Sequence, residues 1–121
     1  MSTSRIWEFR SESGHVSGTD LVGFHVEATD GPIGKIDKHS DEVGDAYLVV
    51  DTGPWIFGSR VLLPAGTVAR VDQHDKKVYV DRTKDEIKNG PGFDPATHGT
   101  DTGYQEQYTA YYGPFYVGPF L

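Results

Sequence analysis

Two short segments each place an imidazole close to carboxylates. His39 is followed by Asp41, and His74 directly precedes Asp75. Imidazole nitrogens and carboxylate oxygens bind zinc and other divalent ions, so these four residues are metal-ligand candidates if the fold brings them together. Both segments also have the composition of turns, where Asp and Ser side chains bond to the nearby backbone. We prefer the interpretation as solvated turns and expect no metal or other cofactor.

Catalytic signatures are missing from the chain. It contains no GxSxG, HExxH or phosphate-loop pattern. Asp51 follows an apolar run, so it is either a buried acid with a raised pKa or a hydrogen-bond acceptor in the turn that follows. The turn is the preferred interpretation. We therefore predict a protein that is not an enzyme and has no catalytic residues.

Composition narrows the class of protein further. The 121 residues fit one domain, and the absence of cysteine excludes disulfides and Cys-ligated metal centres. The N-terminal residues lack the apolar region of a signal peptide, and no stretch approaches the about 18 apolar residues of a membrane-spanning helix. We expect a cytoplasmic protein that does not insert into membranes.

The charge is acidic, with a formal net value of −7. Between Asp20 and Asp94 there are 14 acidic residues against 9 Lys and Arg residues. Such a surface repels the phosphate backbone, so we expect no binding to nucleic acid.

Alternation of apolar and polar residues from position 20 onward predicts short strands. The segment 22–29 alternates, Asp30 and Gly31 form a hairpin-turn dipeptide, and 46–50 is a continuous apolar run. Further strands are expected at 33–36, 60–63, 67–71 and 77–81. This number and spacing of strands predicts an all-β fold, a sandwich or a small barrel.

One short helix follows the strands. Thr83 and Glu86 have the capping-box spacing, and Asn89 with Gly90 ends the helix after one or two turns. Residues 1–18 have the composition of a flexible leader, although Trp7 and Phe9 are unusual in a linker and could dock on the domain or on a second subunit.

Aromatic residues mark two candidate interfaces. One is the loop that carries Trp55 and Phe57, for which burial of Trp55 over a barrel end is an alternative. The other is the tail 95–121, which holds 7 of the 15 aromatic residues. Its candidate interface residues are Tyr104, Tyr108, Tyr111, Tyr112, Phe115, Tyr116 and Phe120.

The tail has three possible conformations. Tyr104, Tyr108, Tyr111 and Tyr112 share one helical face, an extended tail is favoured by the two Gly-Pro pairs, and disorder is opposed by the aromatic content. Burial of each ring removes about 150–250 Å² from water, so we expect the tail to pack on its own barrel or on a second subunit.

An ordered series of short patterns resembles the PRC-barrel family, as a stand-alone bacterial-type member. The matching elements are Leu21-x-Gly23-x-x-Val26, Asp30-Gly31-x-x-Gly34-x-Ile36, residues 47–51, Trp55, residues 61–64, residues 78–81 and residues 83–91. The polar residues 38–40 and the Tyr-rich tail depart from the family pattern.

The resemblance implies a small antiparallel barrel over residues 19–94 and a role in docking onto other proteins. The family includes a domain of a ribosome-maturation factor that contacts a ribosomal protein, and no shared catalytic set. We therefore expect a non-enzymatic interaction module that self-associates, as a homodimer, through its tail and also binds an unknown protein partner. The alternatives are a small-ligand or metal-binding domain and a ribosome-associated assembly factor.

Overall fold

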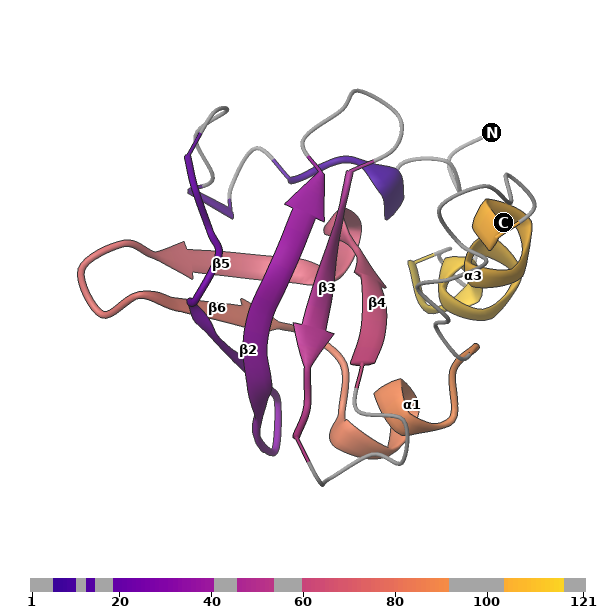
Figure 1. Cartoon of the computed structure of the whole chain (residues 1–121). Coiled ribbons are helices and arrows are strands. Elements are labelled where there is room, and N and C mark those ends of the chain that lie inside the picture. The colour runs from indigo at the N-terminus through magenta and orange to yellow at the C-terminus, as the bar shows by residue number, and fades with distance from the viewer. Residues whose placement is uncertain are drawn as a thin grey trace.

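The computed structural model describes residues 6–10, 13–14, 19–40, 46–53, 60–91 and 104–116 (Figure 1). Within these ranges the chain forms six strands: β1 (His25–Ala28), β2 (Gly31–Ser40), β3 (Tyr47–Asp51), β4 (Arg60–Pro64), β5 (Val68–Asp72) and β6 (Lys77–Val80). The helical elements are the 3-10 turn η3 (Ala65–Thr67), helix α1 (Lys84–Lys88), helix α3 (Tyr104–Tyr112) and the 3-10 turn η4 (Gly113–Tyr116). The chain is thus mostly β, as predicted.

The six strands form one mixed sheet in the order β4-β3-β2-β1-β6-β5. All neighbouring strands are antiparallel except β1 and β6, which pair in parallel. The predicted small antiparallel barrel is therefore confirmed only in part, because one of the five strand pairs is parallel and the sheet formed by the described residues is not closed. Only the three residues of η3 join β4 to β5, so the chain turns a corner there, and β5 and β6 cross behind β2 and β3 (Figure 1).

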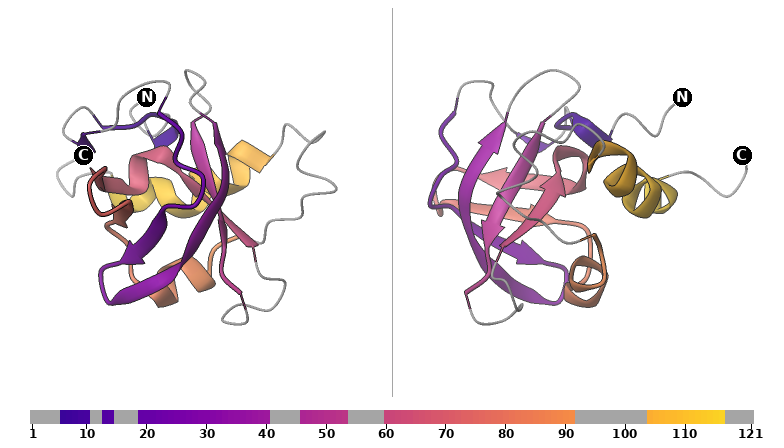
Figure 2. Two further views of the ribbon diagram at one scale, coloured as in Figure 1. Left: turned by 60° about the vertical axis from the view of Figure 1, so that its left-hand side comes forward. Right: turned by 45° about the vertical axis from the view of Figure 1, so that its right-hand side comes forward.

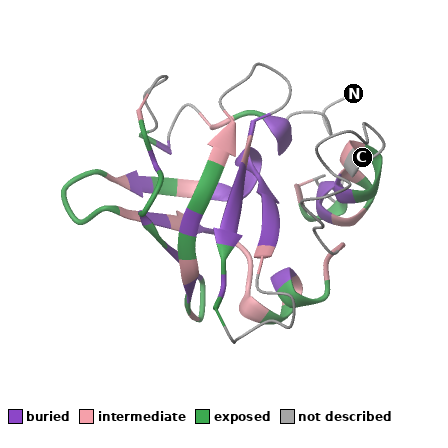
Figure 3. Ribbon diagram, viewed as in Figure 1, coloured by how far each residue is buried: buried purple, intermediate pink, exposed green. Residues whose placement is uncertain are grey.

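The core lies inside this curled sheet. Strand β4 buries every residue after Arg60, and β3 buries its central residues, whereas β2 buries only Ile33 and Ile36 (Figure 3). Leu48, Leu62 and Leu63 are almost completely removed from water. Burial of one such side chain stabilises a fold by about 1.5–3 kcal/mol.

Part of the expected leader belongs to this core. Ile6 and Trp7 are each 3% exposed, and the Ala46 amide donates a hydrogen bond of 2.9 Å to the Trp7 carbonyl. A Cβ at Gly66 would lie 2.5 Å from the Ile6 Cα, so these two backbones approach closely only because residue 66 is glycine. Within the predicted leader, Ile6 and Trp7 are therefore buried and Phe9 is half-buried against the core of the domain.

The predicted helix after the strands is confirmed as α1. The Glu86 amide donates to Thr83 Oγ1 at 3.1 Å, and the Thr83 amide donates to Glu86 Oε1 at 2.9 Å, which is the reciprocal capping box. Ile87 is the buried residue that holds α1 against the core.

The tail adopts the helical alternative over part of its length. Residues Tyr104–Tyr112 form α3, and Gly113–Tyr116 form η4. Figure 2 shows that α3 lies outside the sheet on the same side as the N-terminal residues of the domain. No helix within the described ranges is long and apolar enough to span a membrane.

The tight contact between β2 and the end of β3 requires glycine. Gly34 has a φ of +154°, and a Cβ there would lie 2.1 Å from the Asp51 carbonyl oxygen. We predict that Gly34→Ala lowers the free energy of unfolding by on the order of 3 kcal/mol, because backbone must move. Urea denaturation followed by tryptophan fluorescence measures this loss.

Gly23→Ala is the matched control for that variant. Gly23 also has a positive φ, +90°, but a Cβ there meets nothing within 4 Å. Gly23→Ala should therefore lower the free energy of unfolding only by the cost of the positive φ, about 1–2 kcal/mol. Equal losses in the two variants would contradict the steric account of Gly34.

Candidate interaction surface and adjoining pocket

Helix α3 packs against the N-terminal residues of its own chain. Trp7 Nε1 donates a hydrogen bond of 2.8 Å to Thr109 Oγ1, and the Trp7 ring meets the Tyr108 ring edge-to-face at 6.3 Å. Tyr108 and Tyr112 stack with 6.4 Å between ring centroids, and both are almost completely buried. These two rings belong to the core of the chain itself.

A second set of contacts ties the tail to Asp81, which follows β6, and to Glu86 of α1. The Tyr116 hydroxyl donates to Asp81 Oδ1 at 2.6 Å, and the Tyr111 hydroxyl donates to the Glu86 carbonyl at 2.6 Å. Arg10 forms an ion pair with the same Asp81 carboxylate. Asp81 therefore joins the N-terminal residues, the sheet and the tail.

These surroundings raise the pKa values of three tyrosines of the tail. Burial raises the pKa of Tyr108 and Tyr112 well above the ordinary value. Burial also raises the pKa of Tyr116, and its hydrogen bond to the Asp81 carboxylate raises that pKa further. Both effects disfavour the charged phenolate, so the tail packs only with neutral tyrosines.

Among the tail rings that the structure describes, one remains at the surface. Phe115 is 38% exposed, and it contacts the Arg82 guanidinium at 4.4 Å and the Tyr111 ring at 5.7 Å. We name Phe115, Arg82 and Tyr111 the η4 patch. Val22, which is 52% exposed in the turn before β1, is the other large exposed apolar side chain of the described residues.

The predicted interface residues thus differ in their positions. Tyr108 and Tyr112 are buried within the chain, Tyr111 and Tyr116 are half-buried with bonded hydroxyls, and Phe115 is exposed. Tyr104 begins α3. Trp55, Phe57 and Phe120 lie outside the described residues.

The two histidine segments have separate local roles. His39 Nε2 accepts a hydrogen bond of 3.1 Å from the Leu21 amide, and His74 Nδ1 lies 3.0 Å from the Asp75 carboxylate in the turn between β5 and β6. Within the described ranges no three His, Asp or Glu side chains gather in a group that could hold a metal ion. Asp41 lies outside the described residues.

Strand register produces a row of polar side chains that sequence reasoning missed. Directly opposite residues on successive strands run across the whole sheet in the order Arg60, Asp51, Lys35, His25, Lys77 and Asp72. Each of these residues can be recognised in the sequence as a polar residue of a strand. Their alignment in one row depends on the pairing of β1 with β6, which the sequence pattern does not reveal. Opposite charges at such facing positions stabilise a sheet.

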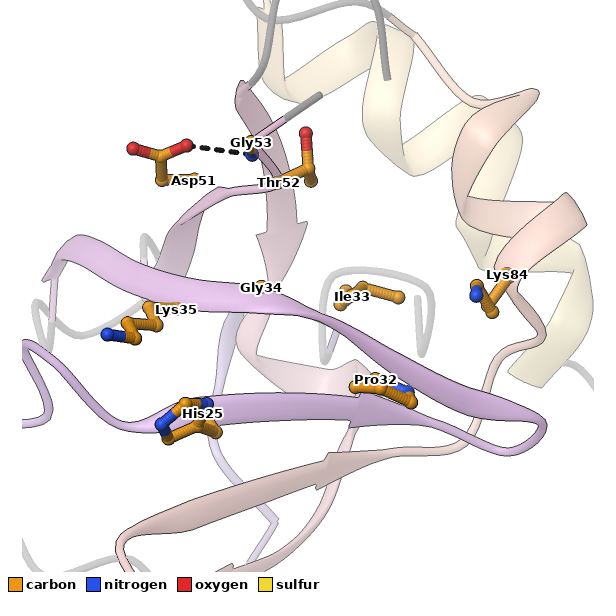
Figure 4. Close-up of a pocket in the computed structure, with 9 residues that line it drawn as sticks. All are labelled: His25, Pro32, Ile33, Gly34, Lys35, Asp51, Thr52, Gly53 and Lys84. Carbon is orange, nitrogen blue, oxygen red and sulfur yellow. Dashed lines mark hydrogen bonds between the residues drawn. The ribbon is translucent and has the colours of Figure 1, made fainter. Parts of the chain in front are cut away.

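A pocket of about 550 Å³ opens beside the middle of this row (Figure 4). Its lining consists of His25, Pro32, Ile33, Gly34, Lys35, Asp51, Thr52, Gly53 and Lys84. Asp51 is exposed and its Oδ1 accepts a hydrogen bond of 3.0 Å from the Gly53 amide, so it is the turn acceptor and not a buried acid. The Thr52 hydroxyl is buried and has no hydrogen-bond partner among the described residues.

The raised pKa values of the buried tyrosines predict a loss of stability in alkali. In the unfolded chain each phenol ionises near pH 10, whereas in the folded chain it keeps its proton. The contribution of the buried tyrosines to the free energy of unfolding is therefore fully present below about pH 10 and is lost as the pH rises above that value. We predict that the free energy of unfolding falls between pH 9 and 11, as estimated from the ordinary phenol pKa of about 10. Urea denaturation across this range measures the slope.

Tyr112→Phe is the test variant for this effect, because its ring keeps the packing but cannot ionise. The fall in stability should be shallower in Tyr112→Phe than in the wild type. Identical slopes would contradict the buried-phenol account.

Comparison with known proteins identifies a family and a similar solved structure. The model of the PRC-barrel domain matches residues 13–87. No curated protein matches the chain. Among solved structures, the chain is similar to a Pseudomonas aeruginosa protein, RimM, assigned to 16S ribosomal RNA processing, with 25% identity and a TM-score of 0.47.

That alignment covers 63% of this chain and 49% of the Pseudomonas protein, so the chain spans about half of its length. The family model covers more than half of the chain, and it includes all six strands and most of α1. This match confirms the resemblance inferred from the short patterns of residues 21–91. The chain belongs to the PRC-barrel domain family.

Proposed function

We propose that this protein is a non-catalytic docking module that binds a basic surface of another protein through the η4 patch. The observation that carries the proposal is Phe115, a large ring that stays 38% exposed while the tail rings of Tyr108 and Tyr112 are buried. Burial of an exposed aromatic ring of this size by a partner is strongly favourable. The patch therefore offers an anchor for protein association.

The patch is held in place before any partner arrives. The Arg82 guanidinium lies 4.4 Å from the Phe115 ring and 5.1 Å from the Tyr116 ring, and the Tyr116 hydroxyl is bonded to Asp81. Ordering of side chains is a large part of the cost of association, so a preordered anchor binds more tightly. Aromatic and Arg side chains are also the types enriched at the centres of interfaces.

Charge favours a basic partner. The net charge of −7 attracts a positively charged surface at long range and accelerates encounter at low salt. Basic ribosomal proteins are one such class, in keeping with the docking role known in the family. Association with ribosomes is thus the form of the proposal that is most readily tested.

Self-association is the second candidate. It rests on the same exposed ring, since Tyr108 and Tyr112 are already covered by the chain itself. A homodimer formed through the tail would therefore use Phe115, or tail residues outside the described ranges, and not the buried face of α3.

Phe115→Ala tests the docking proposal, with Val22→Ala as the matched control. Val22 is the other large exposed apolar residue described, and it lies in the turn before β1 and not in the tail. In co-sedimentation with ribosomes at increasing salt, we expect Phe115→Ala to weaken binding about tenfold, as for a moderate interface hot spot. Wild type and Val22→Ala should bind equally and lose affinity as salt rises.

Two outcomes would contradict the proposal. One is unchanged binding by Phe115→Ala, and the other is a wild-type protein that does not sediment with ribosomes even at low salt. Light scattering on the same samples separates the second candidate, because a dimer that is lost only in Phe115→Ala would identify a second copy as the partner.

A further inference from the structure

The pocket beside the cross-strand row collects basic side chains from three elements. His25 comes from β1, Lys35 from β2 and Lys84 from the first turn of α1. Lys35 and His25 lie together at one end of the pocket, and Lys84 lies at the other end (Figure 4). In a chain with a net charge of −7, this concentration of basic groups is a local exception.

The acidic groups nearest to the pocket have other partners. The Asp51 carboxylate accepts from the Gly53 amide and lies 4.0 Å from Arg60. Glu27 pairs with Lys77 at 3.2 Å, and Asp30 accepts from the Lys84 amide at 2.9 Å. Lys35 has no ion pair with any described residue. Asp51 stands opposite Lys35 in the register of β2 and β3, so the pocket lining combines two lysines with one carboxylate that is already bonded to Gly53 and lies near Arg60.

The middle of the pocket is apolar and open. Pro32, Ile33 and Gly34 of β2 lie between the two basic ends, and Gly53 adds no side chain (Figure 4). A volume of about 550 Å³ lies within the range of small-molecule sites, about 300–1,000 Å³. The lining thus matches a molecule with an apolar middle and negative charge at its ends.

We infer that this pocket binds a small, elongated organic anion that carries an acidic group, carboxylate or phosphate, at each end. Lys35 pairs with one acidic group and His25 donates a hydrogen bond to it, while Lys84 pairs with the other. The apolar spacer lies on Pro32 and Ile33. The site is separate from the η4 patch, so it does not depend on the docking proposal.

Binding is measured on the full chain by titration of its amide NMR spectrum. The probes are linear dicarboxylates from succinate to suberate, with hexanoate as the single-ended acid and hexanamide as the uncharged control. We expect saturable shifts at residues of the pocket wall, an optimum at one chain length, and affinity for that dicarboxylate at least tenfold above that for hexanoate. A phosphonate analogue of the best length then distinguishes a phosphate end from a carboxylate end.

Two lysine variants test which end of the pocket binds each acidic group of the probe. Lys35→Gln should weaken both hexanoate and the dicarboxylate about three- to tenfold, whereas Lys84→Gln should weaken the dicarboxylate alone. Phe115→Ala should bind like the wild type. An unchanged spectrum outside the pocket confirms that each variant is folded.

Three results would overturn the inference. They are an absence of saturable shifts at the pocket, equal affinity for hexanamide and the acids, and affinities that neither lysine variant changes.

Discussion

The Asp81 carboxylate is the point at which three parts of the chain meet. It follows strand β6, pairs with Arg10 from the N-terminal residues and accepts a hydrogen bond of 2.6 Å from the Tyr116 hydroxyl of the tail. A partly buried carboxylate is costly unless its charge is balanced, so each partner stabilises the position of the others. The docking of the tail, and with it the orientation of Phe115, depends on this junction.

The open sheet explains why such a junction is needed. Strands β4 and β5 end the sheet and do not pair with each other among the described residues. Ile6 and Trp7 pack beside η3 and β3, and α3 then covers Trp7, so segments from both ends of the chain complete the core. The PRC-barrel scaffold carries two distinct surfaces: the η4 patch built by the tail and the basic pocket built by β1, β2 and α1.

Local rules of the sequence predicted much of this fold. The strands expected at 60–63, 67–71 and 77–81 are β4, β5 and β6 to within about two residues, as is usual for element boundaries. The capping box of Thr83 and the helical spacing of the tail tyrosines also depend on near neighbours. The parallel pairing of β1 with β6, the Trp7–Thr109 hydrogen bond and the cross-strand row join residues far apart in the chain, which periodicity cannot detect. The sequence therefore singled out Phe115 and Tyr111 of the η4 patch, but neither their contact with Arg82 nor the pocket.

A double-mutant cycle with Asp81→Asn and Tyr116→Phe tests the central role of the junction most directly. Both substitutions preserve shape, and urea denaturation gives the free energy of unfolding for the two single variants, the double variant and the wild type. We predict that the two losses are not additive and differ from their sum by about 1 kcal/mol or more, as for residues in one hydrogen-bond network. Additive losses would show that the Asp81 carboxylate and the tail do not stabilise each other, and would contradict the account.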